Sequence, residues 1–66
     1  MNLEKLIHEL LVQTALTPDG GVCVVGGKSI TIWYCSDIWE WEFQGHTYWD
    51  VQDLAEAILR ACTEAA

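Results

Sequence analysis

The first segment of the chain places apolar residues at the three- and four-residue spacing of one helical face. This spacing predicts a helix from residue 2 to about residue 16, with Asn2 as its N-cap and the turn-forming run 17–21 after its end. The apolar side, expected to face the core, consists of Leu3, Leu6, Ile7, Leu10, Leu11 and Thr14.

Short β-branched and aromatic runs follow, separated by turn residues, and they predict an antiparallel sheet. We expect strands at 22–25, 29–35 and 38–44, with two-residue turns at 26–27 and 36–37. Residues 47–49 fit either a short fourth strand or an extended lead into the next segment.

A second amphipathic helix is predicted from about residue 50 to residue 63, with Asp50 as its N-cap. Trp49 and Leu54 have the spacing of a hydrophobic staple at its start. The expected buried stripe consists of Val51, Leu54, Ala55, Ile58 and Cys62.

The turn at residues 36–37 sets the register of the central hairpin. It brings three apolar pairs to one face, namely Tyr34 with Trp39, Ile32 with Trp41, and Ile30 with Phe43. Both helices can cover this face. The prediction is a single α+β domain of residues 1–66, a two-layer sandwich in the order helix, three-stranded antiparallel sheet, helix (α-β-β-β-α), with both helices on one sheet face.

The same register places Trp33 opposite Glu40 and Thr31 opposite Glu42 on the other face. Two interpretations are open. Trp33 inside an acidic rim suits a contact anchor for a partner, because tryptophan is enriched among interface hot spots. Alternatively, neighbouring side chains half cover Trp33, and Glu40 and Glu42 form a solvated face.

The charge balance narrows the classes of partner. The chain has 10 acidic and 3 basic residues, a formal net charge of -7, and 52% hydrophobic residues, a content that argues against disorder. Too few cations are present to bind nucleic acid directly or to bind an anionic membrane. No apolar run reaches the roughly 18 residues of a membrane span, and the first residues do not resemble a signal peptide. We therefore expect a cytoplasmic protein whose partner, if any, is a basic protein.

No catalytic motif is found, so we expect neither an enzyme nor a cofactor. Glu40 and Glu42 could act as an acid–base pair, but no concave pocket is expected beside them. A metal site from His46, Cys35 and Asp50 has no support from their spacing. The cysteines are Cys23, Cys35 and Cys62. We expect three small buried hydrophobes, of which Cys35 can be partly exposed, with a disulfide or a reactive thiol as alternatives.

In size, acidity and layout, the whole chain resembles the anti-CRISPR proteins of bacteriophages. The resemblance implies an inhibitor of a type I system, for example type I-C, that binds the surveillance complex at a DNA-contacting surface of a Cas subunit or elsewhere on it. Such a surface is rich in cations and attracts carboxylates. The candidate contact residues, from the pattern above, are Trp33, Asp37, Glu40, Glu42, Asp50, Asp53 and Glu56.

An inhibitor of this kind would imitate the negative charge of DNA. Two alternatives to this charge mimicry are open. Acidity can serve solubility alone. The chain can also be a small homodimeric adaptor or regulatory module, in which a fourth tryptophan lies in the interface or the strand at 22–25 pairs with its copy. A monomer is slightly favoured.

Overall fold

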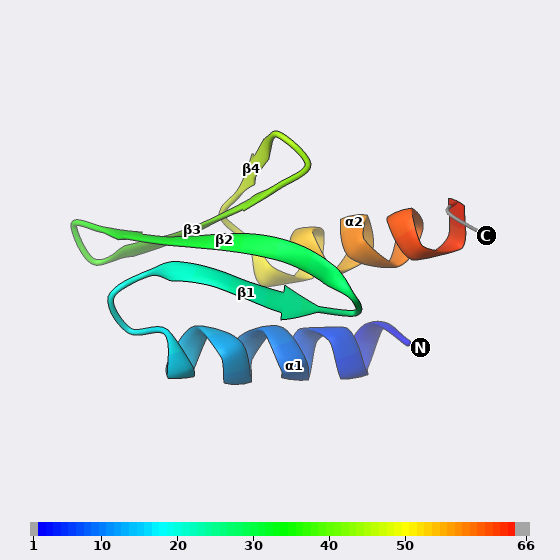
Figure 1. Cartoon of the computed structure of the whole chain (residues 1–66), viewed down its shortest axis with the longest axis horizontal. Coiled ribbons are helices and arrows are strands. Elements are labelled where there is room, and N and C mark those ends of the chain that lie inside the picture. Colours follow the sequence, from blue (N-terminus) through cyan, green and yellow to red (C-terminus); the bar gives the residue numbers. More distant parts are fainter. Residues whose placement is uncertain (1, 65–66) are drawn as a thin grey trace.

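The computed structural model describes residues 2–64. Within this range the elements follow in the order α1 (Leu3–Leu16), β1 (Gly21–Val25), β2 (Lys28–Cys35), β3 (Ile38–Phe43), β4 (His46–Tyr48) and α2 (Val51–Glu64). The strands form one antiparallel sheet in the order β1-β2-β3-β4 (Figure 1). The predicted α+β class is confirmed. The count of three strands is one too low, because residues 46–48 pair with β3 as a short fourth strand, one of the two alternatives for this segment.

Each pair of adjacent strands is joined by a two-residue turn. The backbone φ is positive at both residues of the turns 26–27, 36–37 and 44–45. Two-residue turns of this kind match the twist of the strands they join. The turn at 44–45 reverses the chain after β3, and this reversal makes the extra strand β4 possible.

The predicted register of the β2–β3 hairpin is confirmed. Ile32 pairs with Trp41 and Tyr34 with Trp39. The alternate positions pair Trp33 with Glu40, Thr31 with Glu42 and Cys35 with Ile38. Since successive side chains of a strand point to opposite faces, these two sets lie on opposite sides of the sheet.

One apolar cluster joins both helices to a single face of the sheet. Its buried members are Leu6, Leu10, Cys23, Val25, Ile30, Ile32, Trp41, Phe43, Leu54, Ala55 and Ile58. The expected stripes of the two helices are confirmed at most positions. Leu11 is an exception, because it is 52% exposed. Tyr34 is a second exception, because the β2–β3 turn projects beyond both helices and leaves the end of the hairpin uncovered (Figure 1).

A buried hydrogen-bond chain ties α1 to β3. The Trp41 indole Nε1 donates to Thr14 Oγ1 at 3.1 Å, and Thr14 Oγ1 donates to the Leu10 carbonyl at 2.7 Å. Both predicted helix caps are confirmed. Asn2 Oδ1 accepts from the Lys5 amide, and Asp50 Oδ1 accepts from the Gln52 amide.

Candidate functional site

No helix or strand within residues 2–64 covers the face of the sheet that lies away from the helices. It carries apolar side chains that are exposed and two glutamates that are half-buried. We call it the open face and define it by Val22, Val24, Trp33, Cys35, Ile38, Glu40 and Glu42. Exposed apolar groups gathered on one surface are typical of a contact site rather than of a solvated one.

Two tryptophans flank Glu40 on this face. Trp33 pairs with Glu40 across the β2–β3 hairpin, and the pairing of Trp41 with Tyr48 brings residue 49 beside Glu40. The Trp49 indole Nε1 donates to Glu40 Oε1 at 3.1 Å. Trp33 is 53% exposed and Trp49 is 65% exposed. We call Trp33, Glu40 and Trp49 the tryptophan–glutamate row.

The position of Trp49 corrects one expectation. Leu54 is fully buried, whereas Trp49 is exposed over most of its surface, which does not suit the expected staple between them. The Trp49 indole lies at the open face instead, where its N–H bonds Glu40. Sequence reasoning missed Trp49 as a site residue because its place depends on the pairing of β4.

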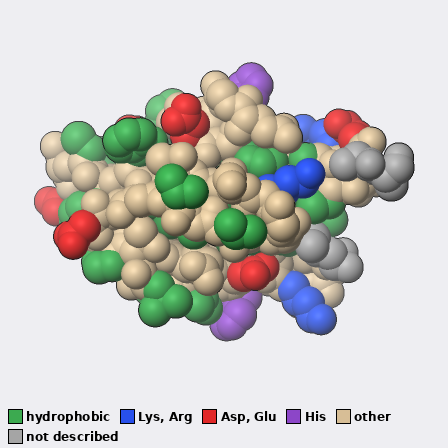
Figure 2. Space-filling view, viewed as in Figure 1, with side chains coloured by type: hydrophobic (Ala, Val, Ile, Leu, Met, Phe, Trp, Pro, Cys, Tyr) green, Lys and Arg blue, Asp and Glu red, His purple; other side chains and the backbone are tan. Residues whose placement is uncertain are grey.

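Among residues 2–64, no Lys or Arg lies on the open face to neutralise its negative charge. Lys28 lies on β2 at an even position, which alternation assigns to the face of Ile30 and Ile32. Lys5 and Arg60 lie on α1 and α2. In Figure 2 the Lys and Arg side chains lie toward the end of the molecule where the termini lie, whereas Asp and Glu side chains lie at both ends.

The remaining candidate carboxylates do not join this face. Asp53 and Glu56 are exposed on α2, roughly opposite its buried residues, and therefore point away from the sheet. Asp50 caps the same helix. The seven candidates thus form no single patch: Trp33, Glu40 and Glu42 lie on one side of the molecule, and Asp53 and Glu56 lie on the other.

Asp37 occupies the tip of the β2–β3 hairpin. Its Oδ1 accepts a hydrogen bond from the Tyr34 hydroxyl at 2.8 Å. This bond, with a smaller contribution from desolvation, raises the pKa of the Tyr34 phenol. Tyr34 also stacks at a tilt on Trp39, with ring centroids 4.5 Å apart. These contacts hold the side chains of Tyr34, Asp37 and Trp39 together at the projecting end of the hairpin.

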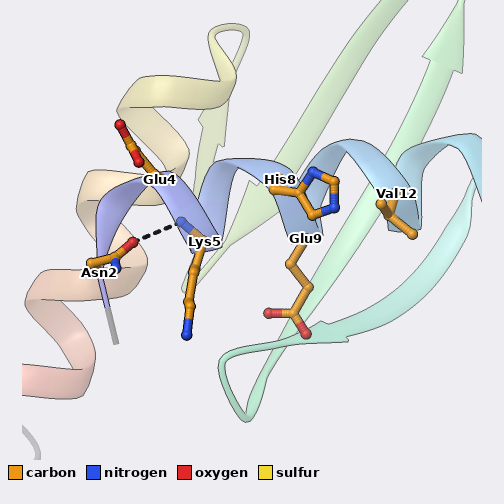
Figure 3. Close-up of a pocket in the computed structure, with 6 residues that line it drawn as sticks. All are labelled: Asn2, Glu4, Lys5, His8, Glu9 and Val12. Carbon is orange, nitrogen blue, oxygen red and sulfur yellow. Dashed lines mark hydrogen bonds between the residues drawn. The ribbon is translucent and has the colours of Figure 1, made fainter.

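A shallow hollow of about 610 Å³ runs along α1 (Figure 3). It is lined by Asn2, Glu4, Lys5, His8, Glu9 and Val12. All six residues are exposed. The hollow is therefore a surface depression, and it lacks the buried polar groups that fix a small ligand in place.

The cysteines differ in exposure. Cys23 is buried, Cys62 is half-buried and Cys35 is exposed, so the expectation of three buried hydrophobes is wrong for Cys35. All three are free thiols. Burial, with a smaller contribution from the nearby charge of Glu9, raises the pKa of the Cys23 thiol.

Two further observations concern residues 2–64 only. No group of three or more His, Cys, Asp and Glu side chains converges there as metal ligands would. Neither α1 nor α2 is long and apolar enough to cross a membrane.

No protein-family model, curated protein or solved structure matches this chain.

Proposed function

We propose that this chain is a small acidic inhibitor that binds a basic protein surface through its open face. The observation that carries the proposal is an uncovered sheet face with an exposed tryptophan, two half-buried glutamates and, in the described part of the chain, no Lys or Arg. The resemblance in size, charge and layout to anti-CRISPR proteins suggests the partner: a DNA-contacting surface of a Cas subunit in a type I surveillance complex. The proposal assigns no reaction, metal or cofactor to the chain and places it in the cytoplasm of the host cell.

Electrostatics supports this kind of partner. Duplex DNA carries one negative charge per ~1.7 Å of its axis, so a protein cleft that holds it is lined with Lys and Arg. A chain with a formal net charge of -7 is attracted to such a cleft, and complementary charge speeds the encounter. Occupying the cleft would then block binding of target DNA.

The position of the carboxylates selects one face for the contact. Glu40 and Glu42 are accompanied by exposed apolar groups, which supply burial as well as charge. Asp53 and Glu56 lie on the far side of the molecule and cannot reach the same flat surface at once. We therefore assign the contact to Trp33, Glu40 and Glu42, with Asp37 at its end.

The experiment measures binding of labelled target duplex to a purified type I surveillance complex while the full chain is titrated. The wild-type chain is expected to displace the duplex, and to do so less well at high salt. The joint change Glu40→Lys and Glu42→Lys is expected to abolish displacement, because it places like charges against a cationic surface. The matched control is Asp53→Lys with Glu56→Lys, which makes the same charge change on α2 and is expected to retain displacement.

Loss of displacement by the α2 pair but not by the sheet pair would move the contact to α2. If neither pair matters and displacement is the same at low and high salt, the electrostatic mechanism is wrong. Absence of any binding to the complex would remove this partner from the proposal. Circular dichroism of each variant separates these outcomes from misfolding.

A homodimeric adaptor is the second candidate, and one observation favours it. β1 is an edge strand of the sheet, and its residues Val22 and Val24 are exposed. Such an edge can pair with a second copy. Light scattering distinguishes the two functions: a tight dimer that the change Val24→Lys dissociates would support the adaptor.

A further inference from the structure

The tryptophan–glutamate row has the composition of a site for an organic cation. Trp33 and Trp49 are both more than half exposed, and Glu40 between them is half-buried. An indole face attracts a cation through its quadrupole, most strongly for tryptophan, and a carboxylate adds a direct ion pair.

The hydrogen bond within the row holds the carboxylate in a fixed place. Trp49 Nε1 donates to Glu40 Oε1 at 3.1 Å, and this bond uses only part of the acceptor capacity of the carboxylate. Oε2 can therefore accept from a donor outside the chain. The same bond limits the rotation of both side chains, so less conformational entropy is lost when a ligand binds.

The surroundings of Trp33 add room for an extended side chain. A hollow of about 400 Å³ lies beside Trp33, between β2 and the turn that contains Asp19 and Gly20. Its lining includes Val22 of the open face, Thr31 of β2 and one carboxylate, that of Asp19. Lys and Arg are absent from this lining. An aliphatic stem can lie in such a hollow while its charged head meets the carboxylates.

We propose that the tryptophan–glutamate row binds the guanidinium group of an arginine side chain presented by a protein partner. A guanidinium is planar, stacks on indole faces and offers several N–H donors to a carboxylate, whereas a lysine ammonium is compact and strongly hydrated. That the partner is a basic protein rests on the proposed function. The ability of the row to bind a guanidinium group rests instead on its own side chains.

The test uses the full chain labelled with nitrogen-15 and follows the indole N–H signals by nuclear magnetic resonance. The probes are four capped tripeptides, Gly-X-Gly, in which X is arginine, lysine, trimethyl-lysine or citrulline. Arginine is expected to shift the signals of Trp33 and Trp49 at millimolar concentration, the range of a single exposed cation contact. The buried Trp41 signal is expected to stay in place. Lysine is expected to bind several-fold more weakly, and uncharged citrulline is expected to produce no shift.

Two variants make the test specific to the row. Glu40→Gln is expected to weaken arginine binding about three- to tenfold, the scale of one partly screened ion pair. The matched control Glu56→Gln removes one charge from the exposed side of α2 and is expected to leave the affinity unchanged. Trp33→Leu keeps an apolar group but removes the indole, and it is expected to weaken binding further.

The proposal would be overturned if citrulline bound with the same affinity as arginine. Equal effects of Glu40→Gln and Glu56→Gln on arginine binding would overturn it as well. Tighter binding of trimethyl-lysine than of arginine would overturn the assignment of the ligand. Salt-dependent binding to the surveillance complex without any arginine-tripeptide binding would reject the row and leave the proposed function standing. The reverse result would reject the partner and leave the row standing.

Discussion

Replacing Thr14 by valine tests the hydrogen-bond chain that ties α1 to the sheet. Thr14 is buried, and its Oγ1 accepts from Trp41 Nε1 while donating to the Leu10 carbonyl. Valine has nearly the same shape but no hydroxyl. The variant therefore leaves the indole N–H of Trp41, itself only 6% exposed, without its acceptor.

The expected loss is a large part of the total stability. A buried donor without an acceptor costs about 1–3 kcal/mol. A chain of 66 residues has a free energy of unfolding of roughly 3–10 kcal/mol. For a domain of this size, 1 kcal/mol corresponds to about 4–8 °C in Tm. A loss of about 2 kcal/mol therefore predicts that Thr14→Val lowers Tm by roughly 8–16 °C.

Urea unfolding followed by circular dichroism measures this loss, and a double-mutant cycle with Trp41→Phe isolates the bond. Thr14→Ser is the control, because it keeps the hydroxyl and loses one methyl group, at about 0.8 kcal/mol. Trp41→Phe is expected to cost less in the valine background than in the wild type, by more than about 0.5 kcal/mol. Additive losses within that margin would refute the reasoning, because the hydrogen bond would then contribute nothing beyond packing.

Three smaller predictions follow from single side chains. The raised pKa of Tyr34 favours the neutral phenol in the folded chain. Its hydrogen bond to Asp37 therefore stabilises the hairpin below the unfolded pKa of about 10, and this stabilisation is lost as pH rises through the folded pKa. Asp37→Ala is expected to lower the pH at which Tyr34 loses its proton, as followed by nuclear magnetic resonance. Iodoacetamide is expected to modify the exposed Cys35 well before Cys23, whose thiol is buried and has a raised pKa, and mass spectrometry showing equal rates would contradict this. Gln44→Asn is expected to raise the free energy of unfolding by about 0.5–1 kcal/mol, because φ is positive there and asparagine adopts that conformation more readily; an unchanged urea midpoint would contradict this.

The register could be predicted because the two-residue turn at 36–37 fixes the alignment of the central hairpin, and a one-residue slip would bury Glu40 and Glu42. The fourth strand could not be decided in the same way. Glutamine rarely adopts a positive backbone φ, as Gln44 does here, so the turn at 44–45 has a weak sequence signal. The exposure of Tyr34 also lay beyond the pattern, because it depends on how far the helices extend along the hairpin.

The candidate site was predictable only in part. Alternation along two strands brings Trp33, Glu40 and Glu42 together, whatever the helices do. The place of Trp49 required the pairing of β4. The separation of Asp53 and Glu56 from the sheet carboxylates required the position of α2, and that position is set by packing between distant segments rather than by local sequence.

Salt dependence separates the two proposed functions because it acts on them with opposite sign. Two copies of the chain, each with a formal net charge of -7, repel one another, whereas a cationic partner is attracted. The Debye length falls from about 8 Å at physiological ionic strength to about 3 Å at 1 M, so salt weakens both effects. We expect binding to a cationic partner to fall with salt, while any self-association through Val22 and Val24 rises. Sedimentation equilibrium and binding to the surveillance complex, each measured over the same salt series, give the two slopes. A dimer that is tight at low salt and does not respond to salt would show that repulsion between copies does not keep the β1 edge free. Val22 and Val24 of the open face would then form an interface between copies.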